Sequence, residues 1–192
     1  MTTHPRLEVV PPCPKQSRVI VRHAEPADLP ALGNLGALLV RLHHQFDPQR
    51  FISPPSNLSE GYKSFLESKL GASHVVIMVA ENEEKEIIGY TYAVIEGVDY
   101  MALRGPAAVL HDIVVSPLAQ GQGIGAALLH ATVDALHARG APRVVLMTAT
   151  ANEPAQRLFE RAGFRPTMIE MTLDLDRTSV QGAKLNVEQN AD

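Results

Sequence analysis

The sequence predicts a mixed α/β fold, in which a mostly antiparallel central sheet carries helices on both faces. Its 192 residues, 45% of them apolar, suit one domain with a sizeable core. Residues 74–96 read as two apolar runs around a charged turn, which is typical of a β-hairpin. From residue 107 the pattern alternates strand, helix, strand, helix, strand. A hairpin region followed by such a half implies antiparallel and parallel pairing in one sheet.

The first part of the chain predicts one strand and two helices. Residues 18–22 are apolar and β-branched, so we expect a short strand there. Residues 26–28 open a helix, and a second helix is expected over 59–70 with Ser59 as its N-cap. Leucines recur at helical spacing along the first helix, and this stripe must pack on something: Leu29, Leu32, Leu35, Leu39 and Leu42.

The middle of the chain predicts three strands. An apolar run over 74–80 and a second one over 87–96 flank the charged turn at 81–86. A loop through Gly105 and Pro106 leads to a third strand over 107–115.

The last part predicts two helices between strands. Apolar residues from Ile124 onward mark a helix that Gly140 ends, and a β-branched strand follows at 143–147. Asn152 can cap a helix that has Pro154 in its first turn, where a missing N–H costs nothing. Gly163 ends this helix, and alternation at Met171, Leu173 and Leu175 predicts a final strand over 164–175.

Both ends of the chain differ in composition from its centre. Residues 1–17 contain four prolines, and residues 177–192 are polar. We therefore expect two flexible tails around a single domain over 18–176.

Composition excludes several classes of protein. A net charge of -4 argues against a nucleic-acid partner. The single cysteine, Cys13, can form neither an intramolecular disulfide nor a metal cluster. No stretch approaches the ~20 apolar residues that a membrane span needs. The expected protein is cytoplasmic, with no metal and no membrane partner.

A glycine-rich segment carries the clearest chemical signal. Residues 115–126 read Val-Ser-Pro-Leu-Ala-Gln-Gly-Gln-Gly-Ile-Gly-Ala, a strand end, a turn and a helix start. Such a turn aims backbone N–H groups and the positive helix end at a phosphate. Two other interpretations are a turn without a ligand and a dinucleotide fold, since Gly121, Gly123 and Ala126 fit G-x-G-x-x-A. The dinucleotide fold also needs an acidic residue about 20 positions on, where residues 144–147 are apolar.

Two motifs in the expected element order resemble the GNAT superfamily of N-acetyltransferases. Gln-Gly-Gln-Gly-Ile-Gly at 120–125 matches its pyrophosphate loop, Arg/Gln-x-x-Gly-x-Gly/Ala. Residues 152–159 resemble its Asn-x-x-Ala-x-x-x-Tyr helix, and Ala-Gly-Phe at 162–164 resembles the element that follows. The resemblance covers residues 18–175 and implies the GNAT fold, whose sheet splays between two parallel strands.

The resemblance also implies a cofactor and the residues that hold it. Acetyl-CoA would lie where strands 113–115 and 144–147 separate, with the backbone of Ile113, Val114 and Val115 along its pantetheine arm. Asn152 would contact it from the other wall, and Phe159 would pack beside its sulfur. Backbone N–H groups of the loop would bind the pyrophosphate: Gln120, Gly121, Gln122, Gly123, Ile124, Gly125 and Ala126.

An acceptor amine must lose a proton before it attacks, because an alkylammonium has a pKa near 10. His111 is the first candidate base, since histidine titrates near neutrality. Residues 110–115 also resemble the Leu-His-x-Leu-x-Val strand of the arylalkylamine N-acetyltransferases, in which the histidine is a proposed base. The alternative is a structural histidine that is hydrogen-bonded within the sheet.

Asp112 and Glu96 are the other candidates for the base. Side chains alternate along a strand, so His111 and Asp112 face the same acceptor only if a bulge intervenes. The alternative for Asp112 is a carboxylate that anchors a helix or loop. Glu96 lies at the end of the preceding strand.

The sequence departs from the family at Phe159, which stands where the resemblance places a tyrosine that protonates the leaving thiolate. Phenylalanine cannot donate a proton, so another group or water must do so. The expected activity is transfer of an acetyl group to a primary amine of a small molecule or peptide by direct attack. A non-catalytic acyl-CoA sensor or scaffold is the alternative, and a homodimer is compatible with the resemblance.

Overall fold

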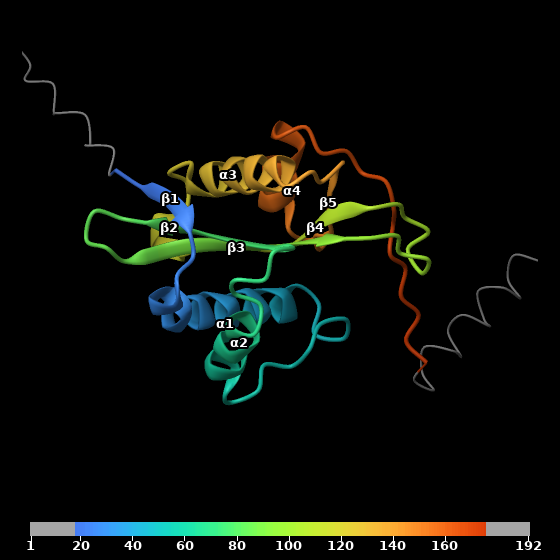
Figure 1. Ribbon diagram of the computed structural model, residues 1–192. Helices are drawn as coiled ribbons and strands as arrows, with labels where there is room; N and C mark the ends of the chain where they lie inside the picture. Colours follow the sequence, from blue (N-terminus) through green and yellow to red (C-terminus); the bar gives the residue numbers. More distant parts are fainter. Residues whose placement is uncertain (1–17, 176–192) are drawn as a thin grey trace, which may run out of the picture.

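The computed structural model describes residues 18–175, and the tails expected at the two ends lie outside this range. A five-stranded sheet runs through the middle of the molecule, with two helices on each side (Figure 1). Its strands follow chain order, and only the last pair is parallel. They are β1 (Ile20–His23), β2 (Val75–Glu81), β3 (Ile87–Glu96), β4 (Ala107–Val115) and β5 (Val144–Leu146).

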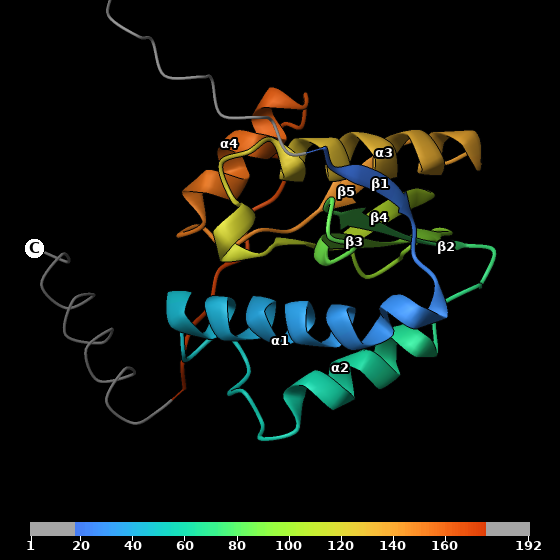
Figure 2. The same cartoon turned by 90° about the vertical axis from the view of Figure 1, so that its left-hand side faces the viewer.

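The helices divide between the two faces of the sheet (Figure 2). A 3-10 turn at Pro26–Asp28 leads into α1, and α1 and α2 cover one face, while α3 and α4 cover the other. The mixed sheet with helices on both faces confirms the predicted fold class. The helices are α1 (Leu29–Phe46), α2 (Leu58–Glu67), α3 (Ile124–Ala138) and α4 (Glu153–Arg161).

Two hydrophobic cores lie on opposite faces of the sheet, and β2 contributes to both. All seven residues of β2 are buried. Because side chains alternate along a strand, Val76 and Met78 pack in the core under α3, whereas Ile77 and Val79 pack in the core under α1. Burial of such a side chain contributes about 1.5–3 kcal/mol, so the central strands hold both helical layers in place.

Two glycines allow α2 to approach α1 closely. A Cβ at Gly33 would lie 2.5 Å from the carbonyl oxygen of Ser59, and one at Gly36 would overlap the ring of Tyr62. The ring therefore rests directly on α1, and its hydroxyl is directed toward the sheet.

The second helix differs slightly from its predicted bounds. It begins at Leu58 and ends at Glu67, before the predicted end at Leu70, and Asn57 replaces the predicted N-cap Ser59. The reason is that the carbonyl of Asn57 already accepts a hydrogen bond from the N–H of Gly61, at 3.0 Å.

The predicted final strand over 164–175 is wrong. The segment forms no strand, and its apolar side chains are exposed, 90% at Met171 and 80% at Leu175. It runs from α4 past the end of the sheet to the side of α1, where Glu170 pairs with Arg50 (Figure 1). A segment with alternating apolar and polar residues forms a strand only when a neighbouring strand supplies backbone hydrogen bonds.

None of the helices within residues 18–175 combines the length and the apolar character that a bilayer crossing requires.

Candidate functional site

The parallel strands β4 and β5 pair over only part of their length. β5 lies beside residues 108–110 of β4, whereas β3 stays beside β4 as far as Val115. Among the described residues, the stretch 111–115 therefore has a strand on one edge alone. Backbone N–H and C=O groups on the other edge can pair with an extended ligand, as in strand addition. Ile113, Val114 and Val115 are the predicted cofactor residues on this stretch.

Side-chain amides hold the loop that follows β4. The amide of Gln120 donates to the carbonyl of Val115 at 3.2 Å, and that of Gln122 donates to Leu118 at 3.5 Å. Gly121 and Gly123 have φ values of +77° and +81°, a left-handed conformation that favours glycine. An added Cβ at either glycine would meet open space, so this side of the loop is free for a close ligand.

The loop ends at the N-terminus of α3, with Gly123 as N-cap and no side-chain cap. The first helical hydrogen bond runs from the N–H of Ala127 to the carbonyl of Gly123. The N–H groups of Ile124, Gly125 and Ala126 therefore have no partner within the helix. Free N–H groups at a helix N-terminus and the helix dipole can hold an anion such as a pyrophosphate, and binding at these residues stays a prediction.

Two further predicted cofactor residues are engaged in the fold. The Asn152 side chain accepts a hydrogen bond from the N–H of Ala155 and so caps α4, which confirms its predicted capping role. Phe159 is only 6% exposed and packs beside Phe164, with 5.9 Å between ring centroids. Contact of either side chain with the cofactor stays a prediction.

A β-bulge at His111 sets the orientation of the candidate bases. Tyr92 pairs with Asp112, but the next residue, Ala93, pairs with Leu110, so His111 is the extra residue. Leu110 packs in the core under α3, whereas Asp112 is directed toward α2. The His111 ring stacks on Tyr92, which belongs to the core under α1. The bulge thus places His111 and Asp112 on one face.

Asp112 anchors three elements from a buried position. It is 6% exposed, and its Oδ2 accepts hydrogen bonds from Tyr62 at 2.6 Å and Tyr90 at 2.8 Å. Burial raises the pKa of the Asp112 carboxyl, although the two hydroxyls and the nearby His111 and His43 favour its ionised form. Burial and the neighbouring Asp112 charge also raise the pKa values of both tyrosines.

Sequence reasoning missed Tyr62 and Tyr90 as partners of Asp112. The available signal was one tyrosine and one aspartate, Tyr90 and Asp112, in otherwise apolar strand segments, because buried hydroxyls need an acceptor. The polar composition of α2 gave no comparable signal for Tyr62.

Glu96 stands between two basic side chains at the end of β3. One carboxylate oxygen accepts a hydrogen bond from Arg104 at 2.6 Å, and the other lies 3.7 Å from His111 Nε2. Glu96 and His111 are each a little over one-third exposed, at 36% and 38% of their side chains. The structure thus brings His111, Asp112 and Glu96 together.

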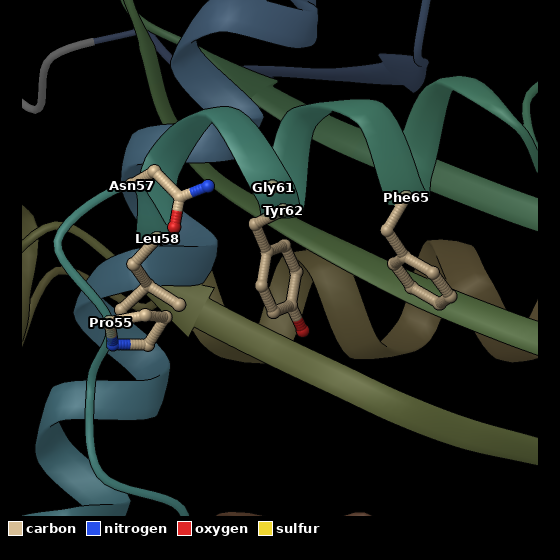
Figure 3. Close-up of a pocket in the computed structure, with 6 residues that line it drawn as sticks. All are labelled: Pro55, Asn57, Leu58, Gly61, Tyr62 and Phe65. Carbon is tan, nitrogen blue, oxygen red and sulfur yellow. The ribbon is translucent and has the colours of Figure 1, made fainter.

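A shallow hollow of about 380 Å³ lies along α2 on the same face (Figure 3). The Tyr62 and Phe65 side chains project into it from α2. Phe65 meets Tyr92 edge to face at 5.5 Å, and Tyr92 stacks on His111 at 5.3 Å. A row of aromatic rings therefore joins the hollow to the candidate base. The lining residues are Pro55, Asn57, Leu58, Gly61, Tyr62 and Phe65.

A strand edge that leads into a glycine loop and a helix N-terminus defines a class of proteins that bind a phosphorylated, extended cofactor. The chain belongs to the Acetyltransferase (GNAT) family, whose model matches residues 39–164. Acetyl-CoA is the acyl donor of this family, as the loop motif predicted.

Curated relatives and solved structures agree with this assignment. A mycothiol acetyltransferase from Beutenbergia cavernae is 40% identical over 72 residues, which cover 36% of this chain and 24% of the relative. The chain thus matches about a quarter of that relative's length.

Structural neighbours share the fold. A tetramutant protein from Bacillus halodurans superposes with a TM-score of 0.69 at 21% identity, covering 81% of this chain and 99% of the other. An aminoglycoside N-acetyltransferase in complex with CoA gives a TM-score of 0.62 at 20% identity, covering 86% and 99%.

Proposed function

We propose that the protein transfers the acetyl group of acetyl-CoA to a primary amine of a small molecule or peptide by direct attack. The main evidence is that β4 leads without interruption into the glycine loop. Its open edge over 111–115 runs directly into the glycine loop and α3, and His111 stands at the start of this edge. One strand therefore aligns a donor site with a base.

The residues present fit acetyl-CoA. The left-handed glycines Gly121 and Gly123 leave open space beside the unpaired N–H groups of α3, which suits a pyrophosphate. The free edge of β4 suits an extended amide-containing arm. Bound acetyl-CoA supplies its acyl group as a thioester, whose carbon becomes bonded to the amine nitrogen as the thiol leaves.

His111 is the proposed base. Its exposed imidazole can reach an acceptor and take the proton of the amine on a ring nitrogen. Asp112 is the weaker candidate, because it is buried and already accepts two tyrosine hydroxyls. Phe159 cannot protonate the thiolate, so we assign this proton to water.

The hollow along α2 is the proposed acceptor site. It opens on the same face as His111, and aromatic rings connect the two. The similarity to the mycothiol acetyltransferase of Beutenbergia cavernae, which spans 36% of this chain, is compatible with an amine acceptor.

The test combines calorimetric titration of the purified protein with acetyl-CoA and a thiol-release assay over a panel of amines. We expect saturable binding and thiol release that depends on an acceptor. His111→Ala should lose turnover and keep its affinity for acetyl-CoA. Binding without release for any amine would instead support an acyl-CoA sensor, and absence of binding would refute the placement of the donor.

A further inference from the structure

A pair of opposite charges adjoins the proposed base. Glu96 directs Oε1 at His111 Nε2, 3.7 Å away, and Oε2 at Arg104 Nη2, 2.6 Å away. The carboxylate therefore acts on the imidazole while an arginine acts on the carboxylate.

The loop between β3 and β4 fixes Arg104 in place. Arg104 and Asp99 exchange two backbone hydrogen bonds of 2.8 and 2.9 Å across the loop. The Asp99 carboxylate accepts from the N–H groups of Met101 and Ala102 and lies 3.6 Å from Arg104 Nη2. The Arg104 side chain is only 15% exposed. The guanidinium thus has one location, and so does the carboxylate bound to it.

Arg104 is not fully hydrogen-bonded in this location. Its Nη1 is buried without a partner among residues 18–175. An unpaired buried donor is costly, so this arginine is not explained as a simple stabilising contact. Its charge beside Glu96 is the property that the site can use.

The other groups around His111 are fixed as well. Its ring stacks on Tyr92 at 5.3 Å and 24°, and the bulge places it next to Asp112. Asp112 is buried and its Oδ2 accepts two tyrosine hydroxyls, so Glu96 is the partly exposed carboxylate that faces the imidazole. The titratable groups around His111 and its neighbours Glu96 and Asp112 are Tyr90, Tyr92 and Glu96 from β3, Asp112 from β4, Asp99 and Arg104 from the loop, Tyr62 from α2 and His43 from α1.

We infer that Glu96 and Arg104 are positioning residues that orient the His111 ring and set the pH range in which it accepts a proton. This inference rests on the proposed function, in which His111 is the base. The Glu96 anion favours the protonated imidazole, and Arg104 weakens this effect by neutralising Glu96. Glu96 and Arg104 therefore have opposite effects on the protonation of His111.

The first test is the pH profile of kcat/KM for the full chain. Glu96→Gln should move the acidic limb to lower pH, and Arg104→Gln should move it to higher pH. Glu84→Gln, an exposed carboxylate in the β2–β3 turn, is the matched control and should leave the profile unchanged. Arg104→Lys keeps the charge and should restore most of the wild-type profile.

Shifts in the same direction, or lower activity with an unshifted limb, would overturn the inference and indicate a structural role. The second test needs no turnover: an NMR titration of histidine-labelled protein, with His111 assigned by loss of its signal in His111→Gln. Opposite shifts of the His111 midpoint in the two variants support the inference even if no amine is acetylated. Turnover with unmoved midpoints would refute the inference and leave the proposed function intact.

Discussion

At the scale of single residues, the hydrogen-bond partners and the exposure of each polar side chain distinguish the residues of the candidate site. Asp112 holds Tyr62 and Tyr90 inside the fold, whereas Glu96 and His111 remain accessible. Neighbouring residues on one strand therefore differ in role: Asp112 joins α2 to the sheet, and His111 is free to meet a substrate.

The raised pKa of Asp112 predicts a specific pH dependence of stability. The folded chain holds its proton more tightly than the unfolded chain, whose value is near 3.8. The stabilisation from this group is therefore complete below about pH 4 and is lost as pH rises from there through the folded pKa. Relative to Asp112→Asn, the wild-type free energy of unfolding should fall across this window. Urea denaturation between pH 3.5 and 7 measures it, and a constant difference would contradict the expectation.

At the scale of elements, the backbone of the loop and the N-terminus of α3 form the proposed donor site. Gly123→Val should abolish acetyl-CoA binding, because the new side chain fills the space beside the free N–H groups of the helix. The positive φ should also cost about 1–2 kcal/mol of stability. Gly140→Val is the matched control: it has φ +84° and open space at the other end of α3.

Both variants should lose comparable stability in urea denaturation, and only Gly123→Val should lose affinity in calorimetric titration. Equal affinities in the two folded variants would refute the placement of the pyrophosphate.

The close contact between α1 and α2 leads us to predict how two glycine substitutions change stability. Gly36→Ala should destabilise the protein by about 1–3 kcal/mol, because its Cβ would overlap the Tyr62 ring and force the helices apart. Gly61→Ala, a glycine within α2 with no atom near the added Cβ, should stabilise by up to about 1 kcal/mol. Thermal or urea denaturation of both variants checks this contrast. A neutral Gly36→Ala would mean that the helices can separate without cost.

Local periodicity and turn residues predicted the helices and the first five strands, because these signals lie within a few consecutive residues. The bulge at His111 depends on the register with β3, and the location of Tyr62 depends on Gly36 of another helix. The final strand failed for the same reason: its pattern is local, but its hydrogen-bond partner would have to come from elsewhere.

At the scale of the whole molecule, the sheet separates the proposed donor site from the proposed acceptor site. The donor loop joins the sheet to α3, whereas the hollow with Tyr62 and Phe65 lies along α2 on the opposite side (Figures 1 and 3). The two cores share the strands but not the helices. Substitutions on α2 should therefore affect the acceptor without affecting the donor, since distant sites act additively.

Phe65→Ala provides the test of this separation. Phe65 is 41% exposed, so its removal should cost little stability. It lines the hollow and contacts Tyr92 beside His111, so its loss should raise KM for the acceptor about tenfold, or ~1.4 kcal/mol. The affinity for acetyl-CoA should stay unchanged in calorimetric titration. A fall in that affinity with an unchanged acceptor KM would place the acceptor elsewhere and make the hollow along α2 a structural feature.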